Sequence, residues 1–228
     1  SFAELESQIF EVENLNETFR FLKGQAAVKD AEETLVMMEQ EVKAIRQGLK
    51  ELRESEERNS LQVQQALDVY EELKKNLREE GATYGPAYAE LQKQVKNIEI
   101  EFTQFVTLNT SGDQVEAREV LEEAEKHTYE LQDLMKRIPV VYEELNKTFP
   151  AQLKEIEDGY KKLLEEKFKF PEENFENDIH RVARRIENST ADLAKVEVAA
   201  VEVANRDPAH EIDTLYTVME REIDAKKY

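Results

Sequence analysis

The sequence predicts an all-α protein made of elongated, tandem, spectrin-like three-helix bundles that share long continuous helices. Apolar residues recur at alternating spacings of three and four along most of the chain, which predicts helices with one narrow apolar stripe each. Charged residues make up 36% of the 228 residues, as expected for long helices whose other faces meet water. Only six glycines and five prolines are present, so turns are few.

The first helix is predicted over residues 2–22, where a heptad pattern ends before Gly24. The second is predicted over residues 27–80 as one unbroken helix, and its stripe alone spans roughly 70 Å. Twelve of the fourteen stripe positions are apolar or aromatic, and the exceptions are Glu56 and Asn59. The stripe consists of Ala31, Leu35, Met38, Val42, Ile45, Leu49, Leu52, Glu56, Asn59, Val63, Ala66, Tyr70, Leu73 and Leu77.

A turn that contains two glycines and a proline separates the second helix from a third, predicted over residues 86–109. The fourth helix is predicted over residues 113–167, after a turn that closes on Asp113, an N-cap candidate. Pro139 and Pro150 are expected to bend this helix or to interrupt its hydrogen bonding.

The fifth helix is predicted to begin at Pro171, and the sequence allows two positions for its end. Either the chain turns at residues 195–198, where β-branched residues alternate, or the helix continues to Asn205 and breaks at Asp207 and Pro208. The internal repeat favours the turn at residues 195–198, with Pro208 as a kink inside the last helix.

The repeat has a period of about 85 residues, at which stripe residues of the second and third helices map onto those of the fourth and fifth. It predicts an incomplete repeat over residues 1–54 and complete repeats over 55–138 and 139–228, with Glu56 and Asn59 at the first junction. The helix missing from the first repeat is expected before residue 1. Some apolar residues of that repeat are then expected to be exposed or to pair with a second chain, namely Phe2, Leu5, Ile9 or Phe10.

The composition restricts the possible partners. The chain has 51 acidic and 31 basic residues and a net charge of −20, which argues against binding to nucleic acid or to anionic lipid. Cysteine is absent, so disulfides and cysteine-based metal sites are excluded, as suits a reducing compartment. No apolar run is long enough to cross a membrane, so membrane attachment is expected only through a helix that this sequence lacks.

No residue pattern indicates catalysis, cofactor binding or metal binding, and the sequence does not identify partner-binding residues. His127, His180 and His210 lack the Glu-x-x-His spacing of di-iron bundles and are interpreted as isolated surface histidines. Three acidic pairs lack the spacing and the glycine of a calcium loop, and are interpreted as solvated helix faces: Glu79 and Glu80, Glu122 and Glu123, and Glu165 and Glu166. We therefore expect neither an enzyme nor a cofactor.

Two groups of apolar residues have alternative interpretations. Aromatic residues concentrate near the turns, where they either cap the bundle ends or form a binding patch; they are Tyr84, Tyr88, Phe102, Phe105, Phe168, Phe170 and Phe175. Four valines either pack onto the next repeat or present an apolar face to a partner; they are Val196, Val198, Val201 and Val203.

A series of landmarks runs through the chain in order. They are Phe19-Arg20-Phe21, the stretch from Thr110 to Leu121, Ile138-Pro139, Phe149-Pro150-Ala151-Gln152-Leu153, Gly159-Tyr160, Ile212-Asp213, Leu215-Tyr216 and Glu220-x-Glu222-Ile223. Together they resemble the septation ring formation regulator EzrA family, and the resemblance covers nearly all of the chain. The Gln-Asn-Arg patch of that family has no match here, so no functional residue is carried over.

The resemblance implies a cytoplasmic rod that one N-terminal helix, absent from this sequence, holds at the bacterial membrane near the division septum. Such proteins bind the tubulin-like protein FtsZ and other divisome proteins, and they restrain ring assembly at wrong places. The spectrin-like repeats of the family agree with the bundles expected from the heptads. A generic cytoskeletal spacer of spectrin type, without an FtsZ link, is the main alternative, and self-association of the rods is a further expectation.

Overall fold

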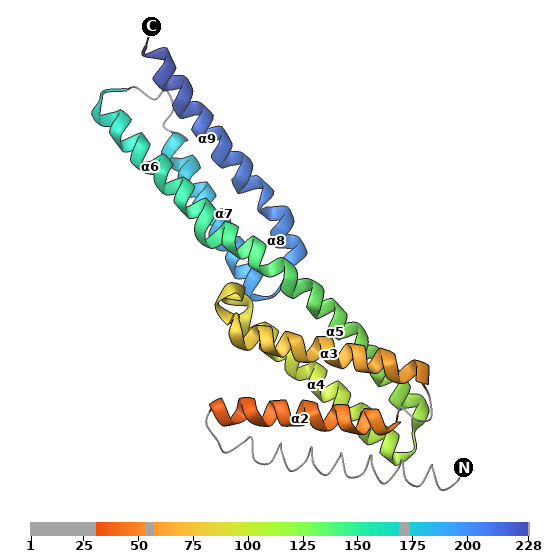
Figure 1. Cartoon of the computed structure of the whole chain (residues 1–228). Helices are drawn as coiled ribbons and strands as arrows, with labels where there is room; N and C mark the ends of the chain where they lie inside the picture. Colours follow the sequence, from red (N-terminus) through yellow and green to blue (C-terminus); the bar gives the residue numbers. More distant parts are fainter. Residues whose placement is uncertain (1–30, 53–56, 169–173, 228) are drawn as a thin grey trace. The chain divides into compact units, whose positions relative to one another are not determined.

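A computed structural model describes residues 31–52, 57–168 and 174–227 of the chain (Figure 1). All regular secondary structure in these residues is helical, which confirms the predicted all-α class. The predicted first helix, with Phe2, Leu5, Ile9 and Phe10, lies outside the described residues. Contacts divide the chain into two compact units: unit 1 is Ser1–Glu79 with Gln92–Asp133, and unit 2 is Glu80–Leu91 with Leu134–Tyr228.

The described helices of unit 1 are α2 (Ala31–Leu52), α3 (Glu57–Glu79), most of α4 (Tyr88–Ser111) and the first part of α5 (Gln114–Glu143). Unit 2 contains the first residues of α4, up to Leu91, and the last residues of α5, from Leu134. Its other elements are a 3₁₀ helix η1 (Gly81–Ala87), a π-helix η2 (Glu144–Thr148), α6 (Phe149–Glu165), α7 (Asn174–Ala194), α8 (Val198–Ala204) and α9 (Arg206–Ala225).

In unit 1, α2 and α3 lie side by side in opposite directions (Figure 1). An ion pair of 2.7 Å joins Arg46 to Glu71, and another of 2.6 Å joins Arg78 to Glu39. Because the later residue of α2 pairs with the earlier residue of α3, the two helices are antiparallel. The prediction of one continuous helix over residues 27–80 is therefore wrong.

The apolar stripe does not distinguish a straight helix from two helices that fold back. Each helix turns its stripe toward the core, so the 3.5-residue period holds on both sides of the change in direction. Val42 and Ile45 of α2 are buried in unit 1, as are Ala66 and Tyr70 of α3. Folding back allows α2 to bury Val42 and Ile45 within one unit, and this removal of apolar surface from water stabilises the arrangement. The repeat boundaries at 54/55 and 138/139 stay predictions.

Both ends of α4 show the turn chemistry that the sequence predicts. Before it, η1 (Gly81–Ala87) contains Gly85 with φ of 52°, a left-handed value. After it, Gly112 has φ of 85°. The carboxylate of Asp113 then accepts a hydrogen bond of 3.1 Å from the N–H of Glu116, which confirms Asp113 as the N-cap of α5.

The predicted fourth helix is confirmed, because α5, η2 and α6 follow one another without a break. Pro139 lies inside α5, whereas the π-helix η2 stands directly before Pro150. Proline offers no N–H for the ladder, and a π turn is one residue wider than an α turn. The wider turn keeps Leu145, Phe149 and Leu153 on the buried side of the helix.

The turn at residues 195–198 is confirmed, and the alternative of a helix that runs on to Asn205 is wrong. Val196 has φ of 62°, and α8 begins at Val198. The helix is interrupted once more at Asn205, three residues before Pro208, as the predicted kink requires.

Three helical columns pack against one another in unit 2: α5 to α6, α7, and α8 to α9 (Figure 1). The hydroxyl of Tyr216 donates to Glu155 at 2.9 Å, and the ammonium of Lys226 donates to the carbonyl of Glu166 at 2.8 Å. The pair of Lys226 and Glu166 lies later in both segments than the pair of Tyr216 and Glu155, so α9 runs parallel to α6. The helix α7 between them runs the other way, which makes unit 2 a three-helix bundle.

Candidate functional site

A cluster of polar side chains interrupts the apolar core of unit 1. It comprises Glu41 of α2, Tyr70 and Lys74 of α3, and Lys96 and Glu99 of α4, and we call it the polar cluster. Glu41 and Glu99 are only 3% and 2% exposed. Charged residues are rarely buried to this extent unless they are paired, so this cluster is the chemically unusual part of unit 1.

Helix packing accounts for the burial of the two glutamates. Glu41 precedes the stripe residue Val42, and Glu99 follows the stripe residue Ile98. A helix with neighbours on two sides buries a face wider than its heptad stripe. Residues directly beside the stripe are therefore covered together with it.

Glu99 is the centre of the hydrogen bonding in the polar cluster. The Tyr70 hydroxyl donates to its Oε2 at 3.4 Å, and the Lys96 ammonium donates to its Oε1 at 3.2 Å. The carboxyl group of Glu41 also shares a hydrogen bond with Glu99. Both oxygens of Glu99 are thereby satisfied.

Two buried atoms of the polar cluster, Oε2 of Glu41 and Nζ of Lys74, have no hydrogen-bond partner within the described part of the chain. The Lys74 ammonium lies 5.3 Å from the centroid of the Tyr70 ring, close enough for a cation–π attraction. A buried polar atom without a partner costs about 1–3 kcal/mol. The burial of Glu41 and Lys74 therefore lowers the stability of unit 1.

The pKa values of the two glutamates are shifted in opposite directions. Burial raises the pKa of Glu41 to about 7, and its hydrogen bond with Glu99 and the charge of Glu99 act in the same direction. Burial by itself would also raise the pKa of Glu99, but the hydrogen bond with Glu41 and the charges of Lys74 and Lys96 bring it below its usual value. Burial lowers the pKa of Lys74. The pair can thus hold one proton, on Glu41, beside an ionised Glu99.

The sequence predicted Tyr70 as a residue of the apolar stripe, but it predicted no polar cluster and none of the four charged members. Heptad spacing marks the centre of a buried face and not its width, so Glu41 and Glu99 look like surface glutamates. The available signal was an acidic residue directly beside the stripe on two different helices, which is common on long charged helices.

The three histidines are divided between the two units. His127 lies in unit 1, with Nδ1 2.7 Å from Oε1 of Glu101 and Nε2 3.4 Å from Oε2 of Glu123. His180 and His210 lie on the surface of unit 2. Among the residues that the structure describes, no group of three or more His, Cys, Asp or Glu side chains is placed to hold a metal ion.

The acidic pairs of the sequence lie on solvated faces, as interpreted: Glu79, Glu80, Glu122, Glu123, Glu165 and Glu166 are all exposed. Of the aromatic residues near the turns, Tyr84, Phe102, Phe105 and Phe175 are buried, which favours packing over a binding patch. Phe170 lies outside the described residues.

Three of the four valines near the last turn pack inside unit 2. Val196, Val198 and Val201 are buried, whereas Val203 is 62% exposed. Their burial argues against an apolar face presented to a partner by these three, whereas packing onto a next repeat stays a prediction. None of the helices over residues 31–52, 57–168 and 174–227 has the length and apolarity that crossing a membrane requires.

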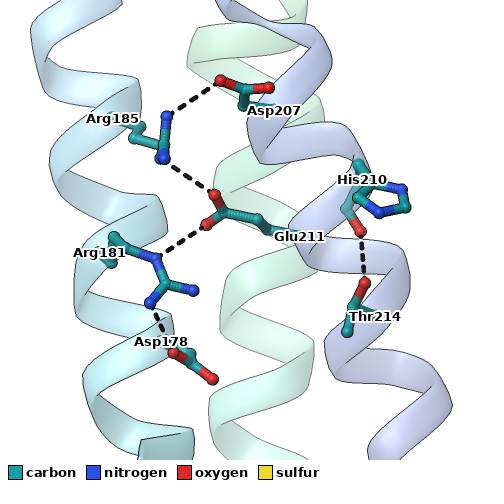
Figure 2. Close-up of polar contacts among 7 residues, drawn as sticks. All are labelled: Asp178, Arg181, Arg185, Asp207, His210, Glu211 and Thr214. Atoms are coloured by element: carbon teal, nitrogen blue, oxygen red, sulfur yellow. Dashed lines mark hydrogen bonds and ion pairs between the residues drawn. The ribbon is translucent and has the colours of Figure 1, made fainter.

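A second set of polar contacts ties α7 to α9 in unit 2 (Figure 2). Glu211 lies between two arginines, 3.4 Å from Nε of Arg181 and 3.0 Å from Nε of Arg185. Each arginine also reaches an aspartate, with Arg181 2.8 Å from Asp178 and Arg185 3.1 Å from Asp207. Most of these charged side chains are exposed to solvent, so their ion pairs contribute little to stability. The ion pairs mainly fix the register of α7 against α9.

Comparison with known proteins gives the chain a family context. A family model described as "Septation ring formation regulator, EzrA" matches residues 1–228. The septation ring formation regulator of Enterococcus faecalis (strain ATCC 700802 / V583) is 70% identical over the whole chain, which covers 39% of that protein. The protein of the same name in Streptococcus suis (strain 98HAH33) is 41% identical, again over the whole chain and 40% of the relative. The chain thus spans about two fifths of these relatives. No solved structure matches it.

Proposed function

Because the chain belongs to the septation ring formation regulator EzrA family, we propose that it is a helical segment of a membrane-anchored bacterial regulator of cell division. In this proposal the whole protein contacts FtsZ and other divisome proteins, modulates Z-ring formation and prevents aberrant septation. The family match over all 228 residues is the observation that carries the proposal. The 70% identity to the Enterococcus faecalis regulator supports it along the full length of the chain.

The site chemistry agrees with a regulator that acts by contact. The polar cluster is the most unusual chemical group among the described residues, and its two carboxyl groups are 3% and 2% exposed. A substrate has no direct access to groups buried in this way. The exposed helix faces carry charged side chains in large number, and the net charge is −20. A partner surface with basic character would complement them.

Anchoring and location are part of the same proposal and rest on the family resemblance. The anchor would be a helix outside this chain, and the segment would lie on the cytoplasmic side of the membrane at the septum. Residues that contact a partner are not assigned. Self-association through helix faces is proposed as a further property of the whole protein.

Sedimentation of FtsZ polymers tests the proposal. Purified FtsZ is assembled with GTP and centrifuged alone, with this chain, and with the complete cytoplasmic region of the same protein. We expect the cytoplasmic region to change the mass of pelleted FtsZ or to sediment with it. An unrelated spectrin-type bundle of similar length and net charge is the control. If the cytoplasmic region behaves like that control, the proposal of an FtsZ regulator fails.

A generic spectrin-type spacer is the second candidate, and the packing of unit 2 favours it. Its three helical columns alternate in direction, as in a spectrin-like bundle, and its exposed polar contacts serve helix packing. This reading needs no FtsZ contact. The sedimentation experiment separates the two, because a spacer leaves the FtsZ polymer mass unchanged.

A further inference from the structure

The two buried carboxyl groups of unit 1 constrain its charge state. Glu41 and Glu99 are 3% and 2% exposed and share a hydrogen bond. Two carboxylates in contact and away from water cannot both be ionised at low cost, so one of them keeps a proton. One of these two carboxyl groups is therefore protonated when α2 is packed against its neighbours.

The neighbouring charges decide which glutamate keeps the proton. The groups that face Glu41 from the other described helices are Tyr70 and Lys74 on α3, and Lys96 and Glu99 on α4. The Lys96 ammonium donates directly to Glu99, and the Tyr70 hydroxyl does so as well. Among the described residues Glu41 has no such donor, and its Oε2 has no hydrogen-bond partner there. Glu99 is consequently the ionised member, and Glu41 is the protonated one.

Only Glu41 belongs to α2, whereas the other members of the polar cluster belong to α3 and α4. We propose that the docking of α2 onto α3 and α4 is coupled to the proton shared by Glu41 and Glu99, so that docking is firmest at acidic pH and weakens as the pH rises toward neutrality.

The other described contacts of α2 are modest, so the charge state of Glu41 can affect the docking of this helix. Val42 and Ile45 are buried. The ion pairs of Arg46 and of Glu39 with α3 involve side chains that are 40% and 54% exposed, and pairs of this kind contribute little. Among the side chains that the structure describes, the docking of α2 thus rests on Val42 and Ile45 next to the ionisable Glu41.

The sign of the pH dependence follows from Glu41. Its pKa is about 7 when α2 is docked and is expected to return toward 4.5 when α2 is released into water. Below pH 4.5 both states hold the proton, so this group adds no pH dependence. As the pH rises from 4.5 to 7, the released state loses its proton first, and docking weakens by up to about 300-fold in total. Glu99, whose pKa is lowered, acts only at more acidic pH.

A carboxyl NMR titration of the full chain tests the coupling directly. Glutamate side chains are labelled with ¹³C, and the Glu41 resonance is assigned from the Glu41→Gln variant. We expect a midpoint near pH 7 for Glu41, well above the ordinary glutamate value of 4.5. A Glu41 midpoint close to 4.5 would overturn the proposal.

Hydrogen exchange of backbone amides reads out the docking itself. Exchange of residues 36–47 is followed by mass spectrometry from pH 5 to pH 8 and corrected for intrinsic rates, with α7 of unit 2 as the internal reference. Protection of residues 36–47 should fall with rising pH in the native chain and in the matched control Glu72→Gln. It should stay constant in Glu41→Gln, whose amide donates to Glu99 without a titrating proton. An equal pH dependence in Glu41→Gln contradicts the coupling, and the titration of the native chain decides the matter if that variant does not fold.

Discussion

Substitution of Gly85 gives the most specific structural prediction, because it combines a cost in backbone conformation with a steric cost. The residue has φ of 52°, and a Cβ placed on it would lie 2.4 Å from two ring carbons of Tyr142 in the same unit. The substitution Gly85→Ala therefore forces an L-residue into a left-handed conformation and drives the new methyl group into an aromatic ring. The ring belongs to α5 and is half-buried, so it has limited room to move.

The two costs can be given rough magnitudes. A left-handed backbone costs an alanine roughly 1–2 kcal/mol relative to glycine. Inserting a methyl group into a packed site costs roughly 1–3 kcal/mol more. We therefore expect Gly85→Ala to lower the free energy of unfolding of unit 2 by roughly 2–5 kcal/mol, the sum of the two terms.

Urea denaturation followed by circular dichroism measures the loss, and Gly112 of unit 1 serves as the reference for the backbone cost. Gly112 has φ of 85°, but a Cβ there would meet no heavy atom within 4 Å. Gly112→Ala should therefore show the backbone cost alone. Adding Tyr142→Ala to Gly85→Ala should recover part of the steric cost relative to Tyr142→Ala alone. If Gly85→Ala costs no more than Gly112→Ala, the steric argument is refuted.

Three further single substitutions and one double-mutant cycle test other contacts by the same unfolding assay. Lys167 is exposed with φ of 60°, so Lys167→Gly should stabilise unit 2 by up to about 1 kcal/mol. Val196 has φ of 62° but is 7% exposed, so Val196→Gly should destabilise it, since roughly 1.5–3 kcal/mol of burial is lost. Tyr70→Phe removes the 3.4 Å bond to Glu99 and should cost unit 1 about 1 kcal/mol. The two bonds of 2.8 and 2.7 Å between Arg137 and Glu202 should give a coupling of up to about 1 kcal/mol in a double-mutant cycle, because both side chains are about one third exposed.

Each of these expectations has a result that contradicts it. A Val196→Gly variant as stable as Lys167→Gly would mean that the Val196 side chain contributes no burial. An unchanged stability in Tyr70→Phe would show that the Tyr70 hydroxyl does not support Glu99. Additive effects of Arg137→Ala and Glu202→Ala would show that the two side chains do not interact in solution.

Local structure could be read from the sequence where a single residue determines the backbone. The N-cap at Asp113, the turn at residues 195–198 and the interruption before Pro208 all follow from side-chain and backbone chemistry within a few residues. The long fourth helix could be predicted for the same reason, because its apolar period continues past Pro139 and resumes after one extra step at Pro150. The family could be recognised from landmark residues as well.

Only the tertiary structure decided which helices face one another. The stripe of α2 and α3 is equally periodic in a straight helix and in two antiparallel helices, because a period records which side of a helix is apolar and not what covers that side. The ion pair between Arg46 and Glu71 shows the antiparallel arrangement. The polar cluster could not be predicted for the same reason. Glu41 becomes unusual only when packing beside Glu99 removes it from water, and Glu99 is far away in the sequence.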